Sequence, residues 1–171
     1  MLTLGRLSNT DPNVLIGYAD ASWACDPDDY SSTSGYVFKL GDTAISWNSK
    51  KQSTVTSSST KAEYMAMSHC TKQALWLRYL LTDIGHFDNP APTTRIFADN
   101  TGAIALAKEP RFHSRTQHIG AQYHSAHKQV KKGAITFTHV PTTEMLANGF
   151  TKPLARDGIM KLVNGCTLQT V

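Results

Sequence analysis

Residues 13–23 have the sequence Asn-Val-Leu-Ile-Gly-Tyr-Ala-Asp-Ala-Ser-Trp, in which one acidic residue, Asp20, interrupts an apolar run. A short apolar run that is followed by turn residues predicts a buried β-strand. An ionised aspartate is costly to bury unless a cation or hydrogen-bond donors accompany it. The stretch therefore predicts either a strand that leads into a cation site or a strand whose acidic end is exposed to solvent.

The segments that follow this strand predict an α/β domain. Further strands are expected at residues 35–40, 43–49, 94–98 and 134–140. Helices are expected at residues 61–84, 102–108, 117–131 and 143–150. Gly41-Asp42 favours a hairpin, so we expect the first three strands to be antiparallel in succession. The later strands alternate with helices, which is the pattern of parallel strands joined by helical crossovers.

The composition is that of one globular domain. The 171 residues are 40% hydrophobic and 18% charged, which allows one core and argues against disorder. Residues 1–12 are expected to form a lead-in segment, 13–154 the folded domain, and 155–171 a C-terminal tail with room for one short helix. The net charge of +4 suits a polyanionic partner, although many soluble proteins share it.

The cysteine, histidine and hydropathy patterns exclude several other classes of protein. The three cysteines are widely spaced and form no CxxC pair, so we expect a reducing, intracellular setting without disulfides or a cysteine zinc site. Four histidines between residues 113 and 127 lack companion cysteines and a shared helical face, so zinc is not expected. No apolar stretch reaches the roughly 18 residues of a membrane span, and no signal-peptide pattern follows Met1. We therefore expect no membrane partner.

Two further acidic residues, Glu63 and Asp99, stand at positions where they can join Asp20. Glu63 lies near the start of the long helix, where the alternative is a capping box with Thr60. Asp99 follows the strand at 94–98, where the alternative is stabilisation by the dipole of the next helix. Ligands gather at the carboxyl ends of strands in such sheets, so we expect the three carboxylates to converge. Three hard oxygen ligands favour Mg²⁺ or Mn²⁺ and the chemistry of two-metal phosphodiester hydrolysis.

Ordered sequence blocks extend this pattern along the chain. They include Gly-Tyr-Ala-Asp-Ala-Ser-Trp-Ala at 17–24, Ser-Ser-Thr-Ser-Gly-Tyr-Val-Phe at 31–38, Ala-Glu-Tyr at 62–64, Asp-Asn at 99–100, His-Ser-Arg-Thr at 113–116 and Thr-Lys-Pro-Leu at 151–154. From about residue 15 to residue 154 the chain resembles the ribonuclease H domain of copia-type LTR retrotransposon polyproteins.

This resemblance implies both a fold and a function. The implied fold is ribonuclease H-like, with a five-stranded mixed sheet flanked by helices. The implied reaction is endonucleolytic hydrolysis of the RNA strand of an RNA/DNA hybrid during reverse transcription, with two Mg²⁺ ions or with Mn²⁺ in their place. The reverse transcriptase domain of the same polyprotein is the implied partner, and a cytoplasmic virus-like particle or the nucleus is the implied location.

The resemblance also assigns four metal ligands, one of which departs from the family pattern. Asp20 would bridge the two ions, and Glu63 and Asp99 would complete one metal site. Asn148 stands where the family has aspartate, so its neutral amide should hold the second ion less tightly. The neighbouring Glu144 is an alternative fourth carboxylate. Reduced catalysis, a hybrid-binding module with weak or lost catalysis, and a purely structural connection domain all remain open.

Further residues are candidates for contacts with the substrate. Recognition of a hybrid needs polar groups for the 2′-hydroxyls and the backbone of the nucleic acid. The candidates are Ser22, Ser59, Thr60, Asn100, Arg115 and His118. The first four lie beside the three carboxylates in sequence, where their alternative roles are in turns and helix caps. The last two belong to a block that recurs in the family.

Overall fold

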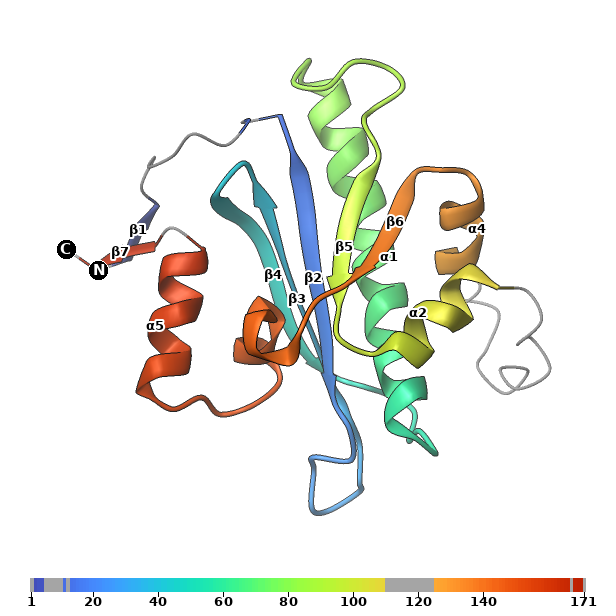
Figure 1. Cartoon of the computed structure of the whole chain (residues 1–171), viewed down its shortest axis with the longest axis vertical. Helices are drawn as coiled ribbons and strands as arrows, with labels where there is room; N and C mark the ends of the chain where they lie inside the picture. Colours follow the sequence, from blue (N-terminus) through green and yellow to red (C-terminus); the bar gives the residue numbers. More distant parts are fainter. Residues whose placement is uncertain (1, 5–10, 12, 110–124, 167, 171) are drawn as a thin grey trace.

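A five-stranded mixed sheet forms the centre of the computed structural model, which describes residues 2–4, 11, 13–109, 125–166 and 168–170 (Figure 1). Its strands are β2 (Leu15–Ser22), β3 (Thr33–Leu40), β4 (Thr43–Lys51), β5 (Thr94–Ala98) and β6 (Ile135–His139). The spatial order is β4-β3-β2-β5-β6, with antiparallel pairing from β4 to β2 and parallel pairing from β2 to β6. The predicted order of antiparallel and then parallel strands is confirmed.

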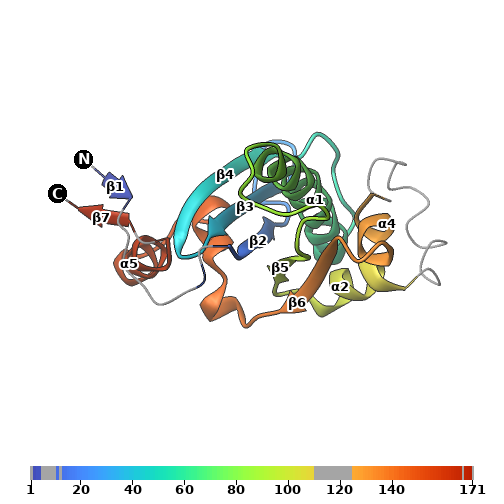
Figure 2. The ribbon, with the colours of Figure 1, turned by 90° about the horizontal axis from the view of Figure 1, so that it is seen from above.

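Helices cover both faces of this sheet (Figure 2). They are α1 (Ser59–Asp83), α2 (Thr101–Lys108), α4 (Ser125–Lys131) and α5 (Arg156–Gly165). Helices α1, α2 and α4 lie on one face, where Met67 of α1 shares a core with Phe38 and Ile96 of the sheet. On the other face, α5 and the turns before it pack on Val37. The part of the predicted 117–131 helix before α4 lies outside the described residues.

Helix α1 is the longest element, and it brings Glu63 to the sheet. Its N-cap is Ser58, whose side chain accepts a hydrogen bond from the backbone N–H of Lys61 at 3.3 Å. A stripe of alanines, methionines and leucines that starts at Ala62 is buried along the helix, so Glu63 enters the core beside the first residue of this stripe. Within the described ranges, no helix is long and apolar enough to cross a membrane.

The segment after β6 is not the α-helix that the sequence predicted for residues 143–150. It forms two 3-10 turns, η3 (Thr142–Glu144) and η4 (Leu146–Phe150), separated by Met145, which has an extended backbone. Asparagine and glycine are weak helix formers, and η4 contains both. A Cβ atom on Gly149 would lie 2.5 Å from Leu162 of α5, so η4 approaches α5 closely at this residue. The helix prediction was wrong because weak propensity and this close packing outweigh the apolar pattern.

Two short strands outside the main sheet bring the ends of the described chain together. Strand β1 (Leu2–Leu4) pairs antiparallel with β7 (Leu168–Thr170), and the two strands lie side by side in both ribbon views. The sequence pattern predicted neither strand. Strands of three residues are too short to show the alternation that identifies longer ones.

Candidate active site

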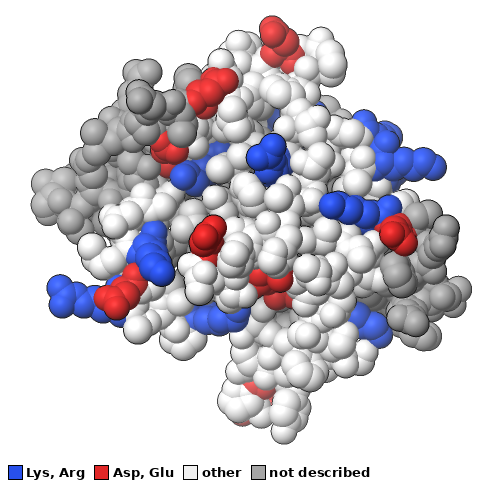
Figure 3. Space-filling model, viewed as in Figure 1, with Lys and Arg blue, Asp and Glu red and all other residues white. Residues whose placement is uncertain are grey.

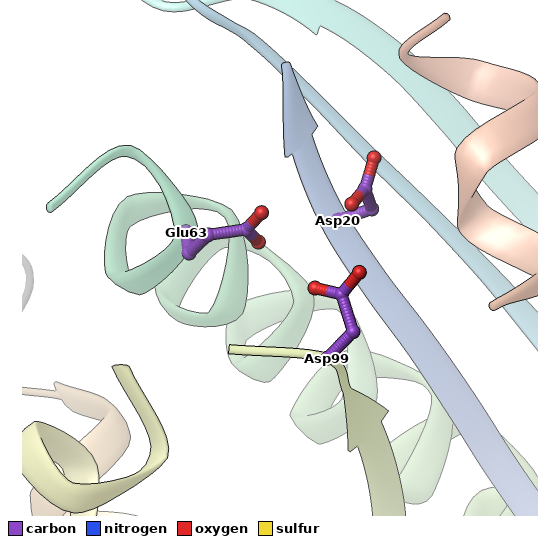
Figure 4. A group of neighbouring side chains, drawn as sticks. All are labelled: Asp20, Glu63 and Asp99. Atoms are coloured by element: carbon purple, nitrogen blue, oxygen red, sulfur yellow. The ribbon is translucent and has the colours of Figure 1, made fainter. Parts of the chain in front are cut away.

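Three carboxylates point toward one another at one end of the sheet (Figure 4). Asp20 lies on β2, Glu63 on α1, and Asp99 directly after β5, and one oxygen of each lies within 4.8 Å of the others. Parallel pairing of β2 and β5 places the carboxyl ends of both strands at the same edge of the sheet. The structure therefore brings together three residues that are far apart in sequence.

Asp20 is fully buried, with 0% of its surface exposed, so the alternative of an exposed strand end was wrong. Thr151 Oγ1 donates a hydrogen bond to its carboxylate, and Lys152 Nζ lies 3.3 Å from each carboxylate oxygen. Burial raises the pKa of Asp20 above its ordinary value, while the Thr151 hydrogen bond and the Lys152 charge oppose this rise. Asp20 is thus a buried carboxyl whose ionised form depends on nearby donors and cations.

Glu63 is also buried, and its carboxylate accepts a hydrogen bond from the backbone N–H of Ala21 at 3.1 Å. The capping-box alternative was wrong because Ser58 is the N-cap of α1 and Glu63 faces the sheet instead. Burial, followed by the charges of Asp20 and Asp99, raises the pKa of Glu63 to about 9. The site without bound cations is therefore short of positive charge.

This shift predicts that, without divalent ions, the free energy of unfolding falls as the pH rises from about 5 to about 9. Folded Glu63 keeps its proton up to a pH of about 9, whereas the unfolded residue releases it near its ordinary pKa of 4.5. The folded state therefore binds more protons in this window, and each rise in pH favours the unfolded state. Asp20, whose pKa is also raised, acts in the same direction.

Urea unfolding in the presence of a chelator, followed by circular dichroism across this pH range, measures the effect. For the single Glu63 proton the expected slope is about 1 kcal/mol per pH unit. Glu63→Gln, which cannot ionise, is the control and should flatten the slope. A stability that rises with pH, or an unchanged slope in Glu63→Gln, would contradict the prediction.

Asp99 is partly exposed and accepts a hydrogen bond from Thr142 Oγ1 at 2.7 Å. The cap of α2 is the next residue, Asn100, whose side-chain oxygen accepts from the N–H of Ala103 at 2.9 Å. Asn100, and not Asp99, therefore caps α2. Thr142 of η3 holds the Asp99 carboxylate in the cluster instead.

Asn148, the predicted fourth ligand, is half-buried in η4. It is connected to the cluster by Lys152, which contacts both Asn148 and Asp20. Its side-chain nitrogen donates to the carbonyl of Thr142 at 2.8 Å, and its side-chain oxygen accepts from Lys152 Nζ at 2.9 Å. Glu144 is exposed and does not belong to the described carboxylate group within 4.8 Å. The structure therefore gives no support to Glu144 as a replacement for the missing aspartate.

Thr151 and Lys152 contact Asp20, and the sequence analysis did not select them as site residues. The available signal was the Thr-Lys-Pro-Leu block at 151–154, which belongs to the family resemblance. Thr151 and Lys152 follow the helix expected at residues 143–150. Their sequence position gave no physical reason to place them beside a carboxylate. Their position depends on the turns that the sequence did not predict.

The described candidates for substrate contact lie at element ends around the carboxylates. Ser22 is on the same face of β2 as Asp20, two residues further on. Ser59 is the first residue of α1, and Thr60 lies against the start of α2, where a Cβ on Gly102 would approach its methyl carbon at 3.2 Å. Asn100 caps α2. The other two candidates, Arg115 and His118, lie outside the described residues.

Among the described residues, charged side chains do not form one basic patch on the face shown in Figure 3. Lysine and arginine side chains are spread around this face, with acidic side chains between them. The net charge of +4 is therefore not concentrated there. On this face, recognition of a polyanion would depend on individual contacts more than on a broad positive field.

Gly35 of β3 allows the end of η4 to approach Asp20. It pairs with Asp20 across the sheet, and a Cβ at this position would lie 2.7 Å from the Thr151 methyl carbon and 2.8 Å from Phe150 Cβ. Gly35→Ala should therefore push Thr151 away and lower the free energy of unfolding by about 1–3 kcal/mol. Urea denaturation measures this change.

Gly158→Ala is a matched control for this substitution. Its Cβ would meet Leu154 Cβ at 3.2 Å on half-buried α5 surface, so the change should stay within about 1 kcal/mol. Equal stability of the Gly35→Ala and wild-type proteins would show that β3 and η4 separate without cost, contrary to the prediction.

The sheet order and the flanking helices define a protein of the ribonuclease H fold class. The structure of LC11-RNase H1, isolated from compost by a metagenomic approach, is similar with a TM-score of 0.55 and 17% identity, over 81% of this chain and 93% of that one. The complex of LC11-RNase H1 with an RNA/DNA hybrid is similar with a TM-score of 0.53 and 14% identity, over 80% and 93% of the two chains. At these identities the similarity concerns the fold alone.

Sequence relatives identify the family more closely. The chain is 46% identical over 142 residues to the retrovirus-related Pol polyprotein from transposon RE2 of Arabidopsis thaliana. The aligned region covers 83% of this chain and 10% of the polyprotein. The chain thus spans about a tenth of the length of these curated relatives. No protein-family model matches it. The chain therefore belongs to the family of copia-type retrotransposon Pol polyproteins, and the part of them that it matches has the ribonuclease H fold.

Proposed function

We propose that this domain hydrolyses the RNA strand of RNA/DNA hybrids, with two divalent ions held by Asp20, Glu63, Asp99 and Asn148. The observation that carries the proposal is the cluster of three carboxylates, within 4.8 Å of one another, in a ribonuclease H fold. Its position at the carboxyl ends of parallel strands is typical of ligand sites in such sheets. The hybrid complex of LC11-RNase H1 supports the choice of substrate class.

The donor set fits Mg²⁺ or Mn²⁺. All three described carboxylates offer hard oxygen atoms, and the cysteines Cys70 and Cys166 are buried elsewhere in the core. Burial and then the charges of the neighbouring carboxylates raise the pKa of both Asp20 and Glu63, so cations beside the cluster would favour its ionised form. Bound divalent ions would supply positive charge, lower the pKa of the attacking water and stabilise the leaving oxygen.

In the proposed reaction, a water oxygen forms a bond to the scissile phosphorus, and the bond between phosphorus and the 3′-oxygen breaks. The leaving oxygen takes a proton, so the products carry a 5′-phosphate and a 3′-hydroxyl. Thr151 and Ala21 hold the carboxylates of Asp20 and Glu63 in place through hydrogen bonds. These residues keep the cluster ordered while the substrate binds.

We propose that Ser22, Ser59, Thr60, Asn100, Arg115 and His118 contact the hybrid. Hydroxyl groups both donate and accept hydrogen bonds, so the first three suit the 2′-hydroxyls that distinguish RNA from DNA. The side-chain oxygen of Asn100 caps α2, so its amide nitrogen is the donor that it offers to substrate. Arg115 suits the phosphates, because a guanidinium group binds them through paired hydrogen bonds.

A second candidate function is a hybrid-binding module with weak or lost catalysis. The observation that favours it is Asn148, which is neutral and engages Lys152 and Thr142 with its side chain. A neutral fourth ligand should weaken binding of the second ion. This alternative expects affinity for the hybrid without turnover.

The polyprotein homologues also suggest where the domain acts. We propose that it works next to the reverse transcriptase domain of the same polyprotein, because the matched region covers only 10% of its Pol polyprotein relatives. Reverse transcription would then place it in a cytoplasmic virus-like particle or in the nucleus. Co-purification of this chain with its reverse transcriptase domain would test the partnership.

Cleavage of an end-labelled RNA strand, paired either with DNA or with RNA, tests the proposed activity. We expect cleavage of the hybrid alone, only with Mg²⁺ or Mn²⁺, and with 3′-hydroxyl ends on the upstream fragments. Hybrid binding without cleavage would favour the second function. If the chain neither binds nor cleaves the hybrid, a structural role as a connection domain would be the remaining function.

A further inference from the structure

The ammonium group of Lys152 lies against the carboxylate cluster. Its Nζ atom is 3.3 Å from both carboxylate oxygens of Asp20 and 2.9 Å from the side-chain oxygen of Asn148. The Asp20 side chain is fully buried, whereas 38% of the Lys152 side chain is exposed. Lys152 therefore covers the open side of a buried carboxylate.

Local contacts hold Lys152 in this position. Its backbone N–H donates to the carbonyl of Asn148 at 3.0 Å, and the preceding residue, Thr151, donates to Asp20 from its side chain. The Asn148 amide nitrogen donates to the Thr142 carbonyl at 2.8 Å, which orients the opposite oxygen toward Lys152. The backbone of Lys152 and both of its oxygen partners are thus fixed by neighbouring contacts.

An ammonium group and a divalent ion require the same kind of partner here. The ammonium has three N–H donors and no acceptor, so it binds oxygen atoms. Mg²⁺ and Mn²⁺ also bind carboxylate and amide oxygens. Asp20 and Asn148, whose oxygens contact Lys152, are the two residues proposed to hold the second ion.

We infer that Lys152 is an internal cation that occupies the oxygens of the second metal site and must leave them before a second divalent ion binds. The inference rests on the proposed function, since it uses the same metal ligands. With all three carboxylates ionised, the cluster and Lys152 together carry a net charge of −2. One divalent ion neutralises this charge. Asn148 adds an oxygen but no charge, so it does not help a second ion to displace the lysine.

Titration of the full chain with Mn²⁺, with free Mn²⁺ counted by electron paramagnetic resonance, tests this inference. We expect the wild-type protein to bind one ion tightly and a second weakly. Lys152→Met keeps the stem without the charge, so the dissociation constant of the second ion should fall about tenfold or more, while the first changes less. Lys152→Arg, which keeps the charge, should retain the weak second step.

Lys161→Met is the matched control, because it removes one positive charge from exposed α5 surface without touching Asp20. It should bind Mn²⁺ like the wild-type protein. Equal second dissociation constants in Lys152→Met and Lys161→Met would overturn the role of Lys152. No uptake of Mn²⁺ by any of these proteins would overturn the proposed metal-dependent function as well.

A measurement on the wild-type protein avoids dependence on the folding of Lys152→Met. The ¹³Cε resonance of Lys152, assigned by its loss in Lys152→Arg, reports on the lysine head group during a parallel titration with Mg²⁺, which is diamagnetic and does not broaden the signal. We expect its main shift in the second binding step, when the ammonium leaves Asp20. A main shift in the first step, or none in either, would contradict displacement by the second ion.

Discussion

Asp20→Asn should abolish cleavage of the RNA strand, with a loss in rate of about a thousandfold or more. Asp20 is the fully buried carboxylate of the cluster, and it contacts both Thr151 and Lys152. Asparagine keeps the shape of the side chain but removes the charge that the divalent ions require. Single-turnover cleavage of a labelled hybrid, with enzyme in excess, measures the loss.

The loss should not come from unfolding. Burial raises the pKa of Asp20, so the ionised carboxyl is costly, and a neutral amide of the same shape removes that cost. The free energy of unfolding should therefore fall by no more than about 1 kcal/mol. Asp88→Asn, an equivalent change at an exposed position after α1, should keep wild-type cleavage. A rate for Asp20→Asn within about tenfold of wild type would contradict the assignment.

The sheet and its three carboxylates were predictable because local signals coincide with the tertiary arrangement. Strand β2 is an apolar run that contains an aspartate, and Asp99 follows β5 with no residue between them. Parallel pairing then brings both strand ends to one edge, which is a general property of such sheets. The burial of Asp20 and Glu63 did not follow from sequence, because each had a local alternative at an element end.

The helix cap shows why local alternatives were hard to separate. Residues 57–60 are Ser-Ser-Ser-Thr, and every one of them has a side chain that can cap a helix. The structure uses Ser58, and this choice leaves Glu63 facing β2 instead of the start of its own helix. The difference of two residues between a cap at Thr60 and the observed cap at Ser58 therefore separates a structural role for Glu63 from a place in the site.

The contacts of Thr151 and Lys152 could not be predicted because they depend on long-range packing. Gly35 leaves room for Thr151 beside β3, and Gly149 allows η4 to approach Leu162 of α5. Neither of these two close contacts, at Gly35 and at Gly149, produces a periodic pattern in the sequence. A regular helix at 143–150, as predicted, would not end in the turn that places Lys152 beside Asp20.

Asn148→Asp should increase the rate of hybrid cleavage by about tenfold to a hundredfold and lower the Mg²⁺ concentration needed for half-maximal rate. The substitution supplies the fourth carboxylate of the family pattern at an oxygen that already lies 2.9 Å from Lys152 Nζ. A charged oxygen there competes with Asp20 for the ammonium and attracts the second ion. Cleavage rates across a Mg²⁺ titration measure both effects.

Two controls separate the new charge from other consequences of this change. Asn148→Ala removes the bond to the Thr142 carbonyl, which aspartate also loses, and it should cleave no faster than wild type. Asn164→Asp adds an acidic residue on exposed α5 surface and should leave the rate unchanged. If wild type binds the hybrid without cleaving it and only Asn148→Asp cleaves, the natural domain is a binding module whose catalysis was lost at this ligand. An Asn148→Asp protein no faster than wild type would show that the neutral amide does not limit the reaction.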